Sequence, residues 1–266
     1  MGRRIRWSLV LALLVMLGFT ACSKGDDSGT GNTNYPAGKA PTVNGKYLVK
    51  VGSTNIQYNA EGQVSKVGNM DYSYEPKRIV ISPNDQIYYL TNGLITELRY
   101  TFMTSMEENA MTVDVVEKYE YDIFGQLVKI TGRSWDYTED VPPGVINLYW
   151  QDGNISKITY TAGGWDDKIV TFSYTSHANT IPFTSMNFGY DVNSYLEWQG
   201  YFGKRCKNLP ARVLTTRPQN TTPSTESSTF DYTISDGMVT KIKETYYNRD
   251  MPASYTNSYV YNLEWW

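Results

Sequence analysis

Short apolar runs alternate with single glycines along most of this 266-residue chain. In residues 119–130 (YEYDIFGQLVKI), tyrosines two positions apart precede Gly125, and an apolar and basic run follows it. Two short strand-like runs joined by a glycine-containing turn are typical of a β-hairpin. The same arrangement surrounds four further glycines, which are Gly62, Gly93, Gly153 and Gly237. The sequence therefore predicts a domain built from repeated hairpins.

The residues around these glycines recur at fixed positions. The second and fifth residues after each glycine are apolar, and the fourth is charged: Val64, Val67 and Lys66; Ile95, Leu98 and Glu97; Leu127, Ile130 and Lys129; Ile155, Ile158 and Lys157; Val239, Ile242 and Lys241. Strict alternation would place the second and fourth residues on one face. A β-bulge beside each turn, with one extra residue on the returning strand, would separate them. The alternative is that the residue beside the turn packs at a rim.

Aromatic residues also follow the repeat. A tyrosine stands four residues before each of the first four glycines, at Tyr58, Tyr89, Tyr121 and Tyr149, but five residues before Gly237, at Tyr232. The chain has 23 tyrosines and eight phenylalanines, and rings with a polar tip suit half-buried sheet faces and rims. We therefore expect tyrosine to supply much of the core.

The spacing of the units predicts the fold class. The first four glycines are separated by 31, 32 and 28 residues, no window shows sustained helical periodicity, and sequential hairpins pair as an antiparallel meander. We expect an all-β domain whose strongly curved sheet forms a partly or fully closed barrel. A transmembrane barrel is disfavoured by Lys129, Lys157 and Lys241 at mid-strand. The repeat fails most clearly at residues 198–210 (WQGYFGKRCKNLP).

The N-terminus has the pattern of an export signal. Three arginines precede an apolar stretch at residues 8–18, which is too short for a permanent membrane span. The following FTAC resembles a bacterial lipobox, which predicts lipidation of Cys22, and Asp26-Asp27 resembles a surface-export tag. We expect a signal peptide at residues 1–21, a flexible lipidated tether at 22–44 and one β domain at 45–266. A plain signal peptide or a short signal anchor would leave Cys22 unmodified.

Charge and cysteine content restrict the partners. Cleavage at Cys22 removes three of 24 basic residues and none of 27 acidic ones, so the mature net charge is 21 minus 27, or −6. This balance opposes nucleic-acid binding, which needs clustered Lys and Arg. With Cys22 lipidated, Cys206 would be the one free thiol, and we expect it to be buried or incidental.

The sequence predicts no catalytic, metal or cofactor site. His177 is the one histidine, which removes histidine-rich metal sites, and its adjacency to Ser176 is no evidence of a triad. Acidic pairs such as Asp166-Asp167 could serve a glycoside hydrolase, but 27 acidic residues make such pairs inevitable. The candidate ligand-binding residues are instead aromatic ones near turns and in the non-repeating segment: Trp135, Trp150, Trp165, Trp198 and Tyr201. Alternatively, these rings cap the ends of the sheet core.

Three hairpin sequences, YNAEGQVSKV, YDIFGQLVKI and YWQDGNISKI, resemble the YD (Rhs-type) repeat. Together with the lipobox, the tether and GYFGKRCKNLP, they make the chain similar to Bacteroidota lipoproteins of the domain-of-unknown-function 4595 family. The resemblance implies a porin-like, barrel-like fold and no established activity. We expect a non-enzymatic outer-membrane lipoprotein at the cell surface, or on the periplasmic face, that binds a glycan or an envelope protein. The alternatives are a glycan hydrolase using a carboxylate pair and a purely structural envelope protein.

Overall fold

The computed structural model describes residues 38–103, 112–132, 143–161, 167–182, 193–217, 224–248 and 256–266. These residues belong to one compact unit, residues 31–266. No helix in the described ranges is long and apolar enough to cross a membrane. The elements are β1 (Leu48–Val51), β2 (Thr54–Tyr58), β3 (Val64–Val67), β4 (Met70–Glu75), β5 (Arg78–Ser82), β6 (Gln86–Thr91), β7 (Leu94–Met103), β8 (Thr112–Tyr121), β9 (Leu127–Thr131), β10 (Val145–Gln151), β11 (Asn154–Thr161), β12 (Lys168–Ala178), α1 (Ser194–Trp198), β13 (Asn208–Arg217), β14 (Ser224–Ser235), β15 (Met238–Asn248) and β16 (Asn257–Trp265).

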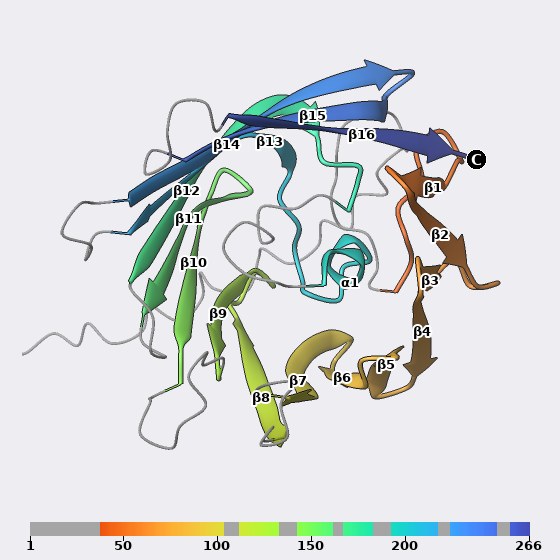
Figure 1. Cartoon of the computed structure of the whole chain (residues 1–266). Coiled ribbons are helices and arrows are strands. Elements are labelled where there is room, and N and C mark those ends of the chain that lie inside the picture. The colour runs from red at the N-terminus through yellow and green to blue at the C-terminus, as the bar shows by residue number, and fades with distance from the viewer. Residues whose placement is uncertain are drawn as a thin grey trace, which may run out of the picture. The chain divides into compact units, whose positions relative to one another are not determined.

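The strands form a closed antiparallel barrel. Each strand pairs with its neighbours in the chain, and β1 pairs with β16 to complete the ring. Figure 1 shows α1 inside this ring. The predicted all-β meander is confirmed, and the sheet is fully closed. Residues 72–81 form two paired strands, because Glu75 pairs with Arg78 and Pro76 lies in the β4–β5 turn.

The predicted bulges are present in all five units. In each hairpin the register shifts beside the turn, so that one residue of the returning strand is left without a direct partner: Ser65, Thr96, Val128, Ser156 and Thr240. The second and fifth residues after every glycine are consequently buried. The fourth residues point to the outer face, where Lys129 binds Glu120 at 2.9 Å and Lys66 binds Asp71 at 2.8 Å.

Two forms of turn carry the repeated glycines. Asn92-Gly93, Asp152-Gly153 and Asp236-Gly237 are two-residue turns in which both residues have positive φ, the geometry that matches strand twist. The turns at residues 59–63 and 122–126 have five residues. Because the longer turn begins closer to the repeated tyrosine, the residue four positions before the glycine lies on the opposite face of its strand. The tyrosine four residues before glycine therefore faces inward at Tyr58 and Tyr121 and outward at Tyr89 and Tyr149.

Each bulge is held by an aromatic residue from the next strand. The backbone carbonyl of the second residue after each glycine accepts a hydrogen bond from a tyrosine hydroxyl or a tryptophan N–H. The donor and acceptor pairs are Tyr74 to Val64 (2.7 Å), Tyr121 to Ile95 (2.6 Å), Trp150 to Leu127 (2.8 Å), Tyr174 to Ile155 (2.6 Å) and Trp265 to Val239 (2.8 Å). A bulge disrupts the hydrogen bonds between the two strands, so a buried backbone carbonyl at the bulge needs another donor. Aromatic side chains with a polar tip meet this need and fill the core.

The two faces of the barrel wall differ in polarity. The inner face carries the apolar core, which includes Ile79, Ile130 and Ile242. The outer face carries ion pairs and a cation–π contact, in which Lys157 Nζ lies 4.1 Å from the centroid of Tyr149. Transmembrane barrels have the reverse arrangement, with an apolar outer band.

Candidate functional site

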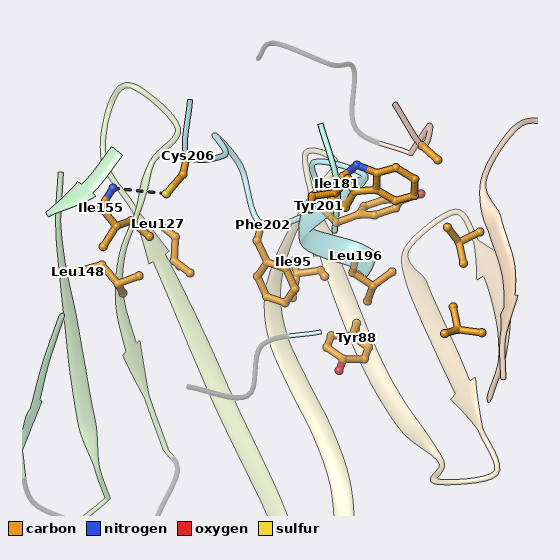
Figure 2. Packing of buried hydrophobic residues seen from close by; sticks show 14 of the residues in the cluster. Tyr88, Ile95, Leu127, Leu148, Ile155, Ile181, Leu196, Tyr201, Phe202 and Cys206 are labelled. Atoms are coloured by element: carbon orange, nitrogen blue, oxygen red, sulfur yellow. Dashed lines mark hydrogen bonds between the residues drawn. The ribbon is translucent and has the colours of Figure 1, made fainter. Parts of the chain in front are cut away.

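The two ends of the barrel are built differently. We call the end that holds the five repeat turns the glycine end. Because successive strands are antiparallel, the connection from β12 to β13 also leaves from this end. Residues 193–207 of this connection form a plug that begins with α1, capped by the Asn193 side chain, which accepts the N–H of Leu196 at 3.0 Å. In Figure 2 the plug residues Leu196, Phe202 and Cys206 lie among barrel residues.

The plug is hydrogen-bonded to the bulges. The N–H of Val64 donates to Gln199 Oε1 at 3.0 Å, that of Ile95 to the Tyr201 carbonyl at 2.9 Å, and that of Ile155 to Cys206 Sγ at 3.4 Å (Figure 2). The plug returns hydrogen bonds to two turns, since its backbone N–H groups donate to the carbonyls of Gly125 at 2.8 Å and Gly153 at 2.9 Å. The plug is therefore an integral part of the fold that closes the glycine end.

The non-repeating segment predicted to bind a ligand is this plug and the start of β13. Trp198 is fully buried and its indole N–H donates to the Thr180 carbonyl at 3.3 Å. Tyr201 is also buried, and its hydroxyl accepts a hydrogen bond from Gln63 Nε2 at 3.0 Å. Trp150 is half-buried and holds a bulge. These three rings are engaged in packing and do not form one exposed patch. Cys22, Trp135 and Trp165 lie outside the described residues.

The inner wall changes character toward the opposite end. On β13–β16 the inward positions continue from apolar residues into polar and aromatic ones, because directly paired residues share a face: Ile242 pairs with Tyr261, and Glu244 with Tyr259. We call this surface the polar inner face. Its members are Arg217, Glu226, Ser228, Glu244, Tyr246, Asn248, Tyr259 and Tyr261. Sequence reasoning missed all eight.

These side chains form connected pairs. Arg217 Nη1 forms an ion pair with Glu226, Ser228 Oγ donates to Glu244 Oε1 at 2.7 Å, and Asn248 Nδ2 donates to the Tyr246 hydroxyl at 3.4 Å. Tyr259 is 47% exposed. The surface thus combines fixed carboxylates, a guanidinium and an accessible ring.

The hydroxyls of Tyr246 and Tyr261 are neutral at physiological pH. Burial raises the pKa of Tyr246 above its ordinary value of 10.0, and the carboxylate of Glu226 acts in the same direction. Burial likewise raises the pKa of Tyr261, with Glu244 adding to the effect. Both side chains can therefore donate as well as accept hydrogen bonds.

A fully buried carboxylate, that of Glu117, lies on the inner face of β8. Glu117 accepts a hydrogen bond from Tyr119 at 2.8 Å and from Tyr100 at 3.4 Å. Tyr119 in turn packs edge-on against Phe202 of the plug, with ring centroids 5.2 Å apart. Glu117 is thus bound into the core, and it is no accessible acid in this structure.

No three His, Cys, Asp or Glu side chains in the ranges given above gather to hold a metal ion. His177 is exposed near the end of β12, as expected for a surface histidine. Cys206 is buried as expected, and its sulfur lies 3.6 Å from the Tyr174 hydroxyl.

Comparison with known proteins agrees with the architecture. Residues 47–241 match the model of a family described as a domain of unknown function (DUF4595) with porin-like fold. A porin-like protein from Bacteroides vulgatus has a similar structure, with a TM-score of 0.57, 15% identity, and coverage of 82% of this chain and 98% of that one. A porin-like protein from Bacteroides uniformis is also similar, with a TM-score of 0.57, 16% identity, and coverage of 80% of this chain and 90% of that one. No curated protein matches the sequence. At these identities the structural likeness establishes a shared fold alone. The family match spans most of the barrel, and the chain belongs to the DUF4595 family, as the motifs of its sequence led us to expect.

Proposed function

We propose that this protein is a non-enzymatic, lipid-anchored cell-envelope lipoprotein whose barrel binds a glycan at the polar inner face. The observation that favours a glycan is the accessible ring of Tyr259 beside Glu244, on the same face as the Arg217–Glu226 ion pair. Sugars offer hydroxyl groups and an apolar ring face together. Carboxylates and guanidinium groups bind the former, and a tyrosine ring stacks on the latter.

The plug supports this placement. At the glycine end the inner side chains are buried against α1 and the segment after it, so they are already covered by protein. At the opposite end several inner side chains of β14–β16 are only partly buried, among them Glu244, Tyr246 and Tyr261. A ligand entering there would meet groups whose mutual hydrogen bonds hold them in place, which lowers the entropy lost on binding.

The test is retention of the mature protein on a panel of immobilised polysaccharides. Tyr259→Ala and Glu244→Gln should each weaken binding about tenfold or more, the loss expected for a stacked ring or a buried polar contact. Tyr247→Ala is the matched control, because Tyr247 is 44% exposed but belongs to the outer face. Binding that Tyr247→Ala weakens as much as Tyr259→Ala, or no retention on any polysaccharide, would contradict the proposal.

The rival enzymatic function uses the same residues differently. Glu226 and Glu244 lie on adjacent strands of one face, so they are the pair of this face to test for glycan hydrolysis, which needs two carboxylates. Release of reducing ends that is abolished by Glu226→Gln or Glu244→Gln would establish this activity. A purely structural envelope protein would bind no glycan, and its deletion would weaken the envelope.

Location in the envelope is a separate part of the proposal. It rests on the lipobox-like FTAC sequence and on Asp26-Asp27. Metabolic labelling with a fatty acid should mark the protein, and Cys22→Ser should abolish the label. Protease added to intact cells should cut the protein; protection in intact cells with cleavage after lysis would place it on the periplasmic face.

A further inference from the structure

Two of the repeat turns have the same local structure. In residues 59–63 and 122–126 the first side chain, Asn59 or Asp122, accepts hydrogen bonds from the backbone N–H groups two and four residues later. The distances are 3.1 and 2.9 Å in the first turn and 2.9 and 2.9 Å in the second. Both turns also have the same pair of backbone hydrogen bonds. Residues at equivalent positions can therefore be compared directly.

The exposed residues at the tips of these two equivalent turns differ in polarity. The first turn presents Ala60 and Glu61, whereas the second presents Ile123 and Phe124, which are 93% and 63% exposed. The residue immediately before the glycine is polar in the other four units and apolar in this one alone. Folding does not need the apolar pair, because the first turn forms the same hydrogen bonds without it. The turn is also rigidly placed, since Gly125 accepts the N–H of Lys204 from the plug.

Other features of the glycine end indicate what the apolar tip contacts. Trp266 is 84% exposed and its backbone pairs with Tyr47 at this end. Lysines also lie here, and Lys204 Nζ is 5.9 Å from the centroid of the Phe124 ring. The further lysines of this end, all exposed, are Lys39, Lys46 and Lys207. Exposed aromatic and aliphatic side chains with lysines are the composition that proteins use at a membrane–water interface.

The N-terminal part of the domain arrives at the same end. The N–H of Gly38 donates to the Gln199 carbonyl at 2.9 Å, and that of Ala40 donates to the Gly62 carbonyl at 3.0 Å. The chain that leads from Cys22 therefore joins the barrel beside the plug. A single acyl chain gives only marginal membrane binding, and stable attachment uses a second contact.

We propose that the glycine end lies on the surface of a lipid membrane, with Ile123 and Phe124 inserted among the lipid headgroups as the second contact. This proposal rests on the lipid anchoring in the proposed function for its geometry, but the insertion itself is a property of the barrel. It directs the polar inner face away from the membrane that carries the protein. A glycan would then reach that face from the side opposite the anchor.

The test uses the whole chain carrying Cys22→Ser, so that no acyl group contributes. Its binding to vesicles of phosphatidylethanolamine and phosphatidylglycerol is measured by co-sedimentation. Replacing Ile123-Phe124 by the Ala-Glu pair of the first turn should reduce the partition coefficient about tenfold or more, since two large apolar side chains are lost. The reciprocal change, Ala60→Ile with Glu61→Phe, should raise it. Val260→Ser is the control, because Val260 is 50% exposed but lies on the β16 strand.

The outcomes separate this inference from the glycan proposal. Reduced vesicle binding by Ile123→Ala/Phe124→Glu, with Val260→Ser unchanged, supports membrane contact. No vesicle binding by the Cys22→Ser chain, or equal binding by all variants, overturns it. A change in oligomeric mass instead of vesicle binding would assign the tip to a protein interface and would also overturn it. Polysaccharide retention depends on the polar inner face and should be the same in all these variants.

Discussion

Replacing Gly203 in the plug by alanine should destabilise the barrel more than replacing a repeat glycine of the same backbone conformation. Gly203 has φ of +79°, and a Cβ added there would lie 2.2 Å from the carbonyl oxygen of Gly125 and 3.2 Å from the Tyr121 ring. The carbonyl is backbone and cannot rotate away. Gly93 has φ of +80° and nothing within 4 Å of its added Cβ, so it is the matched control.

The two substitutions differ by one physical effect. A left-handed backbone conformation costs an L-residue about 1–2 kcal/mol, and both variants share this loss. Gly203→Ala must also push the plug away from the β8–β9 turn, and overpacking of this kind costs about 1–3 kcal/mol more. We therefore expect a loss of about 2–5 kcal/mol in the free energy of unfolding for Gly203→Ala and about 1–2 kcal/mol for Gly93→Ala.

Urea unfolding followed by tryptophan fluorescence measures both values, and Trp198, which is fully buried in the plug, reports directly on plug packing. We expect a lower midpoint urea concentration for each variant and an unchanged slope of the unfolding free energy against urea concentration. Equal losses for the two variants would mean that the plug does not contact the turn closely, and the description of the glycine end would be wrong.

Three further predictions concern other contacts. Tyr121→Phe removes the hydroxyl that binds the Ile95 carbonyl at its bulge, and it should lower the free energy of unfolding in urea by about 1–2 kcal/mol. Tyr149→Phe on the outer face should change that free energy by less than about 0.5 kcal/mol. A larger loss for Tyr149→Phe than for Tyr121→Phe would refute the role of the hydrogen bond at the bulge. In a Cys22→Ser chain, buried Cys206 should react with a thiol reagent only upon unfolding, so fast labelling of the native protein would show that the plug opens readily. Burial raises the pKa of Tyr72 and of Tyr195 to about 12, so both favour the folded state fully below pH 10 and lose that contribution as pH rises toward 12. The free energy of unfolding, measured from pH 8 to 11.5, should fall by about 1.4 kcal/mol per pH unit for each tyrosine above pH 10, and a flat profile would contradict this prediction.

The repeat could be predicted from the sequence because its signal is local. Each glycine sets a turn, and the apolar second residue beside a charged fourth one is compatible with a core only if a bulge intervenes. That inference needed no contact distant in sequence. The repeated tyrosine was harder to interpret, because the same spacing serves two turn lengths. Tyr121 ends its strand and faces inward, while Tyr149 lies further from a shorter turn and faces outward.

The plug could not be predicted because its partners are far away in the chain. Gln199 binds Val64 and Tyr74, which are 135 and 125 residues away in the sequence. No local sequence pattern indicates such contacts. A segment that lacks the repeat and contains Trp198 and Tyr201 was therefore interpreted as a possible binding surface. In the structure the same aromatic residues are buried. Loss of the repeat indicates a different structural role, and that role here is to fill the barrel.

The polar inner face was missed, although its signal is present in the strands. Once the bulge fixes the phase of β15, Ile242 faces inward, and so must Glu244, Tyr246 and Asn248 at successive alternate positions. The alternate positions that face inward on these strands thus become polar with distance from the glycine turn, and this change is visible in the sequence. The repeat units thus have two parts with different purposes. The part beside the glycine builds the closed end, and a ligand is best sought where the same strands stop being apolar inside.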